Sequence, residues 1–343
     1  MSAAGERNME VELPAGLRYV DDRMPGIRRR KLRGKFAYFT PDGERIRLPE
    51  EIERIHKLAI PPAYSDVWIC SDPSGHLQAT GRDARGRKQY RYHSRWIEIR
   101  DTAKYGRLLR FGEALPGMRR LIDRHIGETG LGRHKVMAAV VALLDGTLIR
   151  IGNQRYARDN KSFGLTTMRN RHVDVSGCTI RFAFRGKSGI RHSVSISHPR
   201  LARILKRCLD LPGQELFQYL DDERQRHALS SSDINDYLRQ LTGEDFTAKD
   251  YRTWAGSVLA LEHCRKGSSQ GQGATTRQLK EIIALVAAEL GNSPAICRKC
   301  YIHPAIIDAF LAGELAGMRK ARKRKGLSAE EAALLEFLRQ RPA

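Results

Sequence analysis

The residues of this chain whose types could carry out a reaction lie in four short segments. A guanidinium stays charged and offers a rigid fork of donors to anionic oxygens. A lysine can give up a proton, and a tyrosine oxygen is a nucleophile once it is deprotonated. Taken singly, each such residue is explained as well by an ion pair, a turn or a core position. The segments are 147–156, 185–189, 249–254 and 291–301, and they hold Arg150, Lys187, Arg252, Asn292 and Tyr301.

The net charge of the chain indicates a polyanionic partner. Lysine and arginine total 61 against 39 acidic residues, which gives a formal net charge of +22. A field of this size favours DNA or RNA as the partner. A basic solvated surface and a ribosome-associated factor are the alternatives, and charge alone gives no information about catalysis.

The six cysteines are scattered through 343 residues, which is typical of reduced thiols in a cytosolic protein. Cys297 and Cys300 form a lone CxxC, for which zinc would need two more ligands, and His303 is only an isolated candidate. No run approaches the ~20 apolar residues of a membrane span. We therefore expect neither a metal site nor a membrane partner.

The four segments, in their order and spacing, resemble the catalytic segments of type IB DNA topoisomerases, especially the compact poxvirus-like and bacterial ones. The resemblance extends to Gly164–Arg169 and to Gly86–Tyr92, so it spans roughly residues 60 to 305. Several ordered motifs at compatible spacing are far more specific than a single match.

The resemblance implies a role for each of four residues. Tyr301 would attack phosphorus and become joined to a DNA 3′ phosphate, while Lys187 would protonate the departing 5′ oxygen. Arg150 and Arg252 would bind the non-bridging oxygens, on which the transition state places extra charge. Reversal of the steps reseals the strand with the bond energy kept in the phosphotyrosine, so no ATP is needed. The cations replace a metal's charge, so no cofactor is expected.

Asn292 departs from the family pattern. It lies where many members carry a histidine, nine residues before Tyr301 (301 − 292 = 9). Its amide can donate a hydrogen bond to a phosphate oxygen but cannot carry charge or donate a proton. The resemblance therefore implies phosphate binding at this position without an imidazolium.

The arm around residue 90 resembles the family's N-terminal DNA-contacting segment. Its basic, amide and aromatic side chains can reach phosphates and base edges from a groove. The basic run 319–325 is equally typical of a flexible linker. The implied partner is duplex DNA, preferably supercoiled, bound by a monomer in the cytoplasm at the nucleoid. The expected contacts are Arg87, Lys88, Gln89, Tyr90, Tyr92, Arg155 and Tyr156.

The pattern of apolar residues predicts an α+β protein. Residues 1–24 are polar and expected to be flexible, 25–100 to form a small, mainly β domain, and 101–343 to form a larger, mainly helical catalytic domain. Alternation predicts three antiparallel strands between residues 172 and 196, with Lys187 at a hairpin tip. The resemblance implies that the two domains close as a clamp around DNA.

Periodicity and caps predict the helices of the larger domain. Two helices, 103–115 and 116–126, are expected to precede a buried apolar helix over 135–144. Thr247–Asp250 and Ser328–Glu331 have the spacing of capping boxes and predict two further helix starts.

Two other interpretations remain open. A tyrosine recombinase shares the Arg, Lys, Arg and Tyr chemistry. Its second arginine usually follows a His-x-x-Arg pattern, whereas this chain has Lys249-Asp-Tyr-Arg252. A non-catalytic DNA-binding or architectural protein would fit the charge but would leave the ordered set unexplained.

Overall fold

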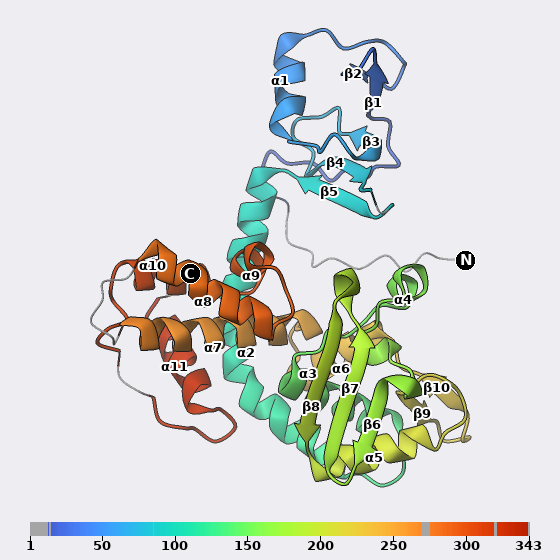
Figure 1. The fold of residues 1–343 in the computed structure, drawn as a ribbon, viewed down its shortest axis with the longest axis vertical. Coiled ribbons are helices and arrows are strands. Elements are labelled where there is room, and N and C mark those ends of the chain that lie inside the picture. The colour runs from blue at the N-terminus through green and yellow to red at the C-terminus, as the bar shows by residue number, and fades with distance from the viewer. Residues whose placement is uncertain (1–12, 14, 85, 269–274, 319–320, 342–343) are drawn as a thin grey trace. The chain divides into compact units, whose positions relative to one another are not determined.

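The computed structural model describes residues 13, 15–84, 86–268, 275–318 and 321–341 (Figure 1). The chain divides after Tyr105 into two compact units. Arg319 and Lys320, at the start of the predicted basic run, lie outside the described residues, as do residues 1–12 and 14. No helix in the described part of the chain is long and apolar enough to cross a membrane.

The first unit is built on a five-stranded antiparallel sheet with the strand order β2-β1-β3-β4-β5. Helix α1 (Pro49–Lys57) packs on the sheet through Ile55, which joins Ile27 and Ile69 in a buried cluster. β5 is an edge strand, so its residues lie at the border of the sheet. The strands are β1 (Ile27–Leu32), β2 (Lys35–Phe39), β3 (Ser65–Ile69), β4 (Leu77–Arg82) and β5 (Lys88–Tyr92).

The described part of the segment that we expected to be flexible makes defined contacts with this sheet. The Val20 amide donates to His76 Nδ1 at 3.1 Å, and Thr80 Oγ1 donates to Asp22 at 2.9 Å. Leu17 is buried. Residues 17–24 therefore pack onto the first unit, because their few apolar and polar groups find partners on neighbouring strands.

A single helix, α2 (Ser94–Gly127), replaces the two helices predicted over 103–126, so this prediction is wrong. Pro116 lies inside α2, at a cost of about 3 kcal/mol to an ordinary helix. The flanking residues Phe111, Leu115 and Met118 are almost fully buried. Burying each such side chain contributes about 1.5–3 kcal/mol. Continuous packing on both sides of the proline therefore outweighs the lost backbone hydrogen bond.

The second unit is mainly helical and contains a three-stranded antiparallel sheet of order β6-β7-β8, which confirms the predicted α+β class. The buried apolar helix predicted over 135–144 is α3 (Arg133–Thr147). The other helices are α4 (Gln154–Asn160), α5 (Pro199–Leu209), α6 (Ser231–Thr242), α7 (Ala248–Ser268), α8 (Thr276–Glu289), α9 (Pro294–Cys300), α10 (Pro304–Leu311) and α11 (Ala329–Arg339). A small ribbon pairs β9 (Gln218–Leu220) with β10 (Arg226–Ala228).

The three strands β6 (Val173–Ser176), β7 (Thr179–Arg185) and β8 (Arg191–Ser197) follow the predicted alternation. Ile180 and Phe182 are fully buried on one face, where Ile180 pairs with Ile196 across the sheet. The chain reverses between β7 and β8 in a short turn, Lys187–Gly189, as predicted. The turn that carries Lys187 therefore lies at one end of the sheet.

A half-buried ionic network fixes the C-terminal helix. Arg119 of α2 donates to Asp145 of α3 at 2.7 Å and to Glu331 of α11 at 2.8 Å. Glu331 also accepts from the Trp254 indole at 3.2 Å, and its cap partner Ser328 forms the predicted capping box. Arg119 thus joins α2 to α3 and α11, and Glu331 joins α11 to α7.

We predict that Arg119→Ala lowers the free energy of unfolding by about 2 kcal/mol, because two half-buried carboxylates lose their charged hydrogen-bond partner. Arg339→Ala is the matched control, since Arg339 also joins α11 to α2 through Glu113 but is exposed. It should cost no more than about 1 kcal/mol. Urea unfolding followed by intrinsic fluorescence measures both, and equal losses would contradict the special role of the network.

Candidate active site

The segment that carries Arg150 is fixed by a close backbone approach. Leu148 ends α3 with φ of 55°, which turns the chain out of the helix. The Arg150 carbonyl then accepts from the Leu165 amide at 2.9 Å. A Cβ on Gly164 would lie 2.4 Å from this carbonyl oxygen, so the approach requires glycine. The motif 164–169 therefore acts as a backbone clamp on the arginine segment.

Arg150 reaches the turn between α8 and α9. Its Nη2 donates to the Gly291 carbonyl at 3.1 Å and to Asn292 Oδ1. Gly291 has φ of +59°, which lets the chain leave α8 sharply. Burial lowers the pKa of Arg150, while the neighbouring Tyr301 hydroxyl acts in the opposite direction. The arginine stays cationic even so, because an unperturbed guanidinium deprotonates only far above neutral pH.

Arg252 projects from α7 into the same region and is only 4% exposed. Its guanidinium donates to the Leu148 carbonyl and, at 2.5 Å, to the Leu290 carbonyl. It lies 5.3 Å from the centroid of the Tyr301 ring. Burial, and then the charge of Arg150, lower the pKa of Arg252. The buried Arg252 guanidinium thus binds the C-terminal ends of α3 and α8 and lies beside the Tyr301 ring.

Two buried donors at this site have no hydrogen-bond partner among the described residues. They are Asn292 Nδ2 and Arg252 Nε. Leaving a buried donor unsatisfied costs about 1–3 kcal/mol, so such groups are uncommon in the interior. Both belong to side chains that the sequence assigned to phosphate binding. Two such N–H donors are suited to an anionic oxygen.

The backbone of Tyr301 packs against α7. It caps α9, and its carbonyl accepts from Ser257 Oγ at 3.2 Å. The same Ser257 Oγ accepts from the His303 amide at 3.0 Å. A Cβ on Gly256 would lie 2.7 Å from the Tyr301 carbonyl oxygen. Sequence reasoning missed Gly256 and Ser257, because nothing in a helix sequence marks which residues a distant segment approaches.

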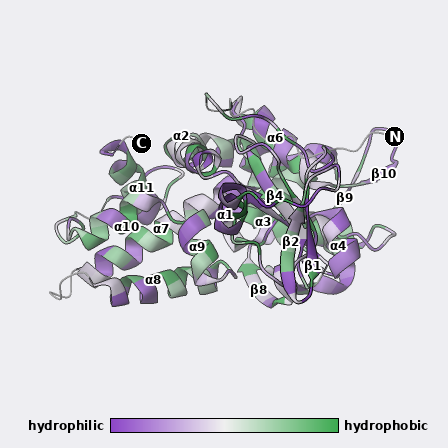
Figure 2. Cartoon of the chain, turned by 90° about the horizontal axis from the view of Figure 1, so that it is seen from above, coloured by the Kyte–Doolittle hydropathy of each residue, from purple (hydrophilic) through white to green (hydrophobic). Residues whose placement is uncertain are grey.

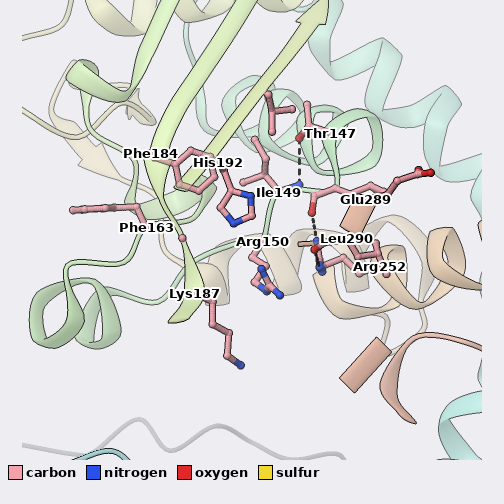
Figure 3. Close-up of a pocket in the computed structure, with 13 residues that line it drawn as sticks. Thr147, Ile149, Arg150, Phe163, Phe184, Lys187, His192, Arg252, Glu289 and Leu290 are labelled. Atoms are coloured by element: carbon pink, nitrogen blue, oxygen red, sulfur yellow. Dashed lines mark hydrogen bonds between the residues drawn. The ribbon is translucent and has the colours of Figure 1, made fainter. Parts of the chain in front are cut away.

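Lys187 lines a pocket together with Arg150, Arg252 and His192. Figure 3 shows its side chain extending from the hairpin tip, away from the pocket wall. The turn is closed by the Gly186 amide, which donates to the Ile190 carbonyl at 2.7 Å. The lysine is therefore carried on a short, hydrogen-bonded turn.

His192 is another residue of the site that sequence reasoning missed. Its ring stacks on Phe184 with centroids 5.2 Å apart and lines the pocket (Figure 3). Burial, and then the charges of Arg150 and Arg252, lower the pKa of His192. A titratable residue in an otherwise aliphatic alternation was the available signal.

The predicted DNA contacts on β5 belong to the first unit, and several are already engaged by acids. Lys88 pairs with Asp22, and Asp83 accepts from Arg87 at 2.8 Å and from Gln89 at 3.0 Å. Tyr90 and Tyr92 stack on each other with centroids 6.1 Å apart.

Arg155 and Tyr156 lie on α4, a largely hydrophilic helix without a buried residue (Figure 2). Asn153 caps this helix by accepting from the Tyr156 amide at 2.9 Å. The Arg155 side chain is 92% exposed. Tyr156 nevertheless interacts electrostatically with Arg150, whose pKa burial lowers and the tyrosine acts to raise.

The CxxC pair lies beside the site but has the properties of core cysteine. Burial raises the pKa of Cys297 to about 11, so its thiol stays protonated at neutral pH. No group of three or more His, Cys, Asp or Glu side chains within the described ranges is arranged to hold a metal ion.

Comparison with known proteins gives the same family throughout. A family model for the catalytic core of eukaryotic DNA topoisomerase I matches residues 93–324, and one for the N-terminal domain of bacterial DNA topoisomerase IB matches residues 35–83. The chain belongs to the type IB DNA topoisomerase family. It is therefore an enzyme that changes DNA topology, with DNA as its substrate.

Viral relatives support this membership. The DNA topoisomerase 1B of Acanthamoeba polyphaga mimivirus is 31% identical over 287 residues, covering 81% of this chain and 85% of that protein. The DNA topoisomerase I of Monkeypox virus is 23% identical, covering 71% and 75%. The DNA topoisomerase 1B of Vaccinia virus (strain Western Reserve) is 22% identical over the same shares. The topoisomerase interpretation is thereby favoured over the recombinase and the non-catalytic protein.

We predict that Gly256→Ala lowers the rate of plasmid relaxation by on the order of 10²-fold, because the new Cβ displaces Tyr301 by a fraction of an ångström or more. Gly267→Ala on the same helix is the control, since its Cβ would meet only ordinary contacts at 3.8 Å. Initial relaxation rates at equal enzyme concentration measure the effect. Equal activity of the two variants would show that the close approach is unimportant.

Proposed function

We propose that the chain relaxes supercoiled DNA by transient cleavage of one strand through a 3′-phosphotyrosine at Tyr301, followed by strand rotation and religation. Neither ATP nor a metal takes part. The observation that carries the proposal is the cluster in which Arg150 and Arg252 both interact with Tyr301, while Asn292 Oδ1 accepts a hydrogen bond from Arg150.

Charge stabilisation is the first step that this cluster supports. The phosphorane-like transition state places extra negative charge on the non-bridging oxygens, where fixed donors in a desolvated pocket act most strongly. Arg252 Nε and Asn292 Nδ2 are buried donors with no hydrogen-bond partner among the described residues. A scissile phosphate would satisfy both, so their unpaired state favours substrate binding at this point.

Activation of the nucleophile is the second step. The Tyr301 hydroxyl interacts with the guanidiniums of Arg150 and Arg252. Two neighbouring cations stabilise the oxyanion that forms as the phenol loses its proton. The phenol proton passes to solvent water as the oxygen attacks phosphorus, so the step uses no carboxylate or imidazole.

Protonation of the leaving group is the third step, and we assign it to Lys187. The lysine lines the same pocket as the two arginines and carries exchangeable protons, whereas Asn292 has none to give. Religation is the reverse: the 5′ hydroxyl returns its proton to Lys187 and attacks phosphorus, and Tyr301 leaves. The number of phosphodiester bonds is conserved, so no external energy source is consumed.

DNA binding would use β5 and α4. We propose that phosphates replace Asp22 and Asp83 as partners of Lys88 and Arg87, while Gln89, Tyr90 and Tyr92 meet the bases and sugars. Arg155 and Tyr156 would contact the strand near the cut. The enzyme would act as a monomer that closes around duplex DNA, with supercoiled DNA preferred, in the cytoplasm at the nucleoid.

The decisive experiment is relaxation of negatively supercoiled plasmid in EDTA without ATP. We expect the wild type to relax the plasmid and to be trapped on DNA by SDS, because the phosphotyrosine bond survives denaturation. Tyr301→Phe should do neither, and Arg252→Ala should be slower by on the order of 10²–10³-fold.

Tyr219→Phe is the control for loss of a tyrosine hydroxyl elsewhere in the second unit, and it should keep full activity. Relaxation by Tyr301→Phe would remove this residue from its proposed role. Failure of the wild type under these conditions, with activity restored by a metal or ATP, would refute the cofactor-free mechanism.

We also predict that Asp22→Asn tightens DNA binding by up to about fivefold at low salt, because a partly exposed ion pair worth ~0.2–1 kcal/mol no longer competes with phosphate. Lys88→Ala should weaken binding and lower the slope of log affinity against log salt by up to ~0.9. Fluorescence anisotropy with duplex DNA across a salt series, using Tyr301→Phe protein, measures both. Weaker binding by Asp22→Asn would contradict this view of the pair.

A further inference from the structure

We propose that His192 is a positioning residue whose ring sets the place of the Lys187 turn relative to the phosphate-binding turn at Asn292. The inference rests on the proposed function, because it concerns how the lysine is delivered to the leaving oxygen. Among the described residues, no hydrogen bond joins the His192 side chain to the nucleophile or to the proposed phosphate donors. Its proposed role is therefore one of packing.

The ring of His192 lies between two glycines. A Cβ on Gly186 would lie 2.5 Å from His192 Cδ2, and a Cβ on Gly291 would lie 2.5 Å from His192 Cε1. Both distances are far below van der Waals contact, so each turn approaches the ring more closely than any side chain would allow. Gly186 directly precedes Lys187, and Gly291 directly precedes Asn292.

The ring therefore acts as a spacer between two segments that are about a hundred residues apart in sequence. On a third side it stacks on its cross-strand neighbour Phe184, with an angle of 15° between the rings. This stacking fixes the plane of the imidazole. A flat ring of fixed orientation defines one separation between the turns, whereas a flexible aliphatic side chain would allow several.

The two turns that contact the His192 ring depend on it to different degrees. The Gly291–Asn292 turn is also held by hydrogen bonds from Arg150, at 3.1 Å to the Gly291 carbonyl and to Asn292 Oδ1. The Lys187 turn protrudes at the end of the sheet and is closed by its own backbone bonds. Loss of the ring should therefore release mainly Lys187, and the phosphate-binding donors should stay in place.

The charge state of His192 fits a steric role. Burial, Arg150 and Arg252 lower its pKa, so the ring is neutral at neutral pH. A neutral ring adds no third cation to the pocket. Because the contacts with both glycines are packing contacts, a phenyl ring should serve nearly as well as imidazole.

The test compares two leaving groups in single-turnover cleavage of a duplex oligonucleotide by the full chain. One substrate has the normal 5′ oxygen at the scissile bond, and the other has a bridging 5′ sulfur. A thiol has a pKa of about 8.5, so a thiolate departs without protonation. A defect in delivering the Lys187 proton should therefore appear with oxygen and largely disappear with sulfur.

We expect His192→Ala to cleave the oxygen substrate on the order of 10²-fold more slowly, since small displacements of a catalytic group have effects of this size. With the sulfur substrate the loss should shrink to less than about tenfold. His192→Phe should stay near the wild type with both substrates. Ile196→Ala on the same strand face is the control for general weakening of the hairpin, and sulfur should give it no selective rescue.

Gly186→Ala offers a second route to the same result if His192→Ala folds poorly. Its new Cβ would press on the ring from the other side, so the same sulfur-rescued defect is expected. Combining the two substitutions should add little to the defect of His192→Ala, because they act through one contact. Thermal unfolding of each variant identifies any that fail to fold.

The outcomes separate this inference from the proposed function. Equal losses of His192→Ala with oxygen and sulfur, or no loss at all, would overturn the role of the ring. Lys187→Ala is the reference, because sulfur should rescue it if the lysine is the proton donor. Failure of that rescue would refute the lysine's role in the proposed function, whereas rescue of Lys187→Ala without rescue of His192→Ala would refute only the present inference.

Discussion

The whole site depends on keeping one buried guanidinium, that of Arg252, satisfied by backbone carbonyls. A buried cation must be paired or hydrogen-bonded, since its desolvation costs several kcal/mol. Here the carbonyls come from Leu148, just past α3, and Leu290, just past α8. Both lie at helix ends, where carbonyls lack intrahelical partners and the helix dipole is negative. The same bonds that solvate Arg252 thus bring the Arg150 segment and the Asn292 turn together.

The electrostatics of the site follow from this arrangement. Burial and then the charge of Arg150 lower the pKa of Arg252, and burial and then both arginines lower the pKa of His192. Asn292 adds a donor without adding a charge that varies with pH. The groups that face the proposed phosphate are therefore of fixed charge, so the pocket's attraction for an anion changes little across the neutral range.

The sequence predicted what depends on local pattern and motif, and missed what depends on packing between distant segments. Strand alternation and the glycine-flanked turn were sufficient to place Lys187 at a hairpin tip. Pro116 was interpreted as a helix start, because the burial that carries α2 through it comes from other helices. Gly256 and His192 were missed for the same reason, since their neighbours at Tyr301 and at the two turns are remote in sequence.

The position of α11 has a consequence for the limits of the catalytic core. The family match ends at residue 324, yet α11 begins at Ala329 and buries one whole apolar face, including Leu334, Phe337 and Leu338. It also supplies Glu331 to the Arg119 network. A fragment trimmed at the family boundary would expose the complementary surface of α2 and α7 to water. The core of this chain is therefore larger than the family boundary, and the trimmed fragment would be prone to self-association rather than a minimal enzyme.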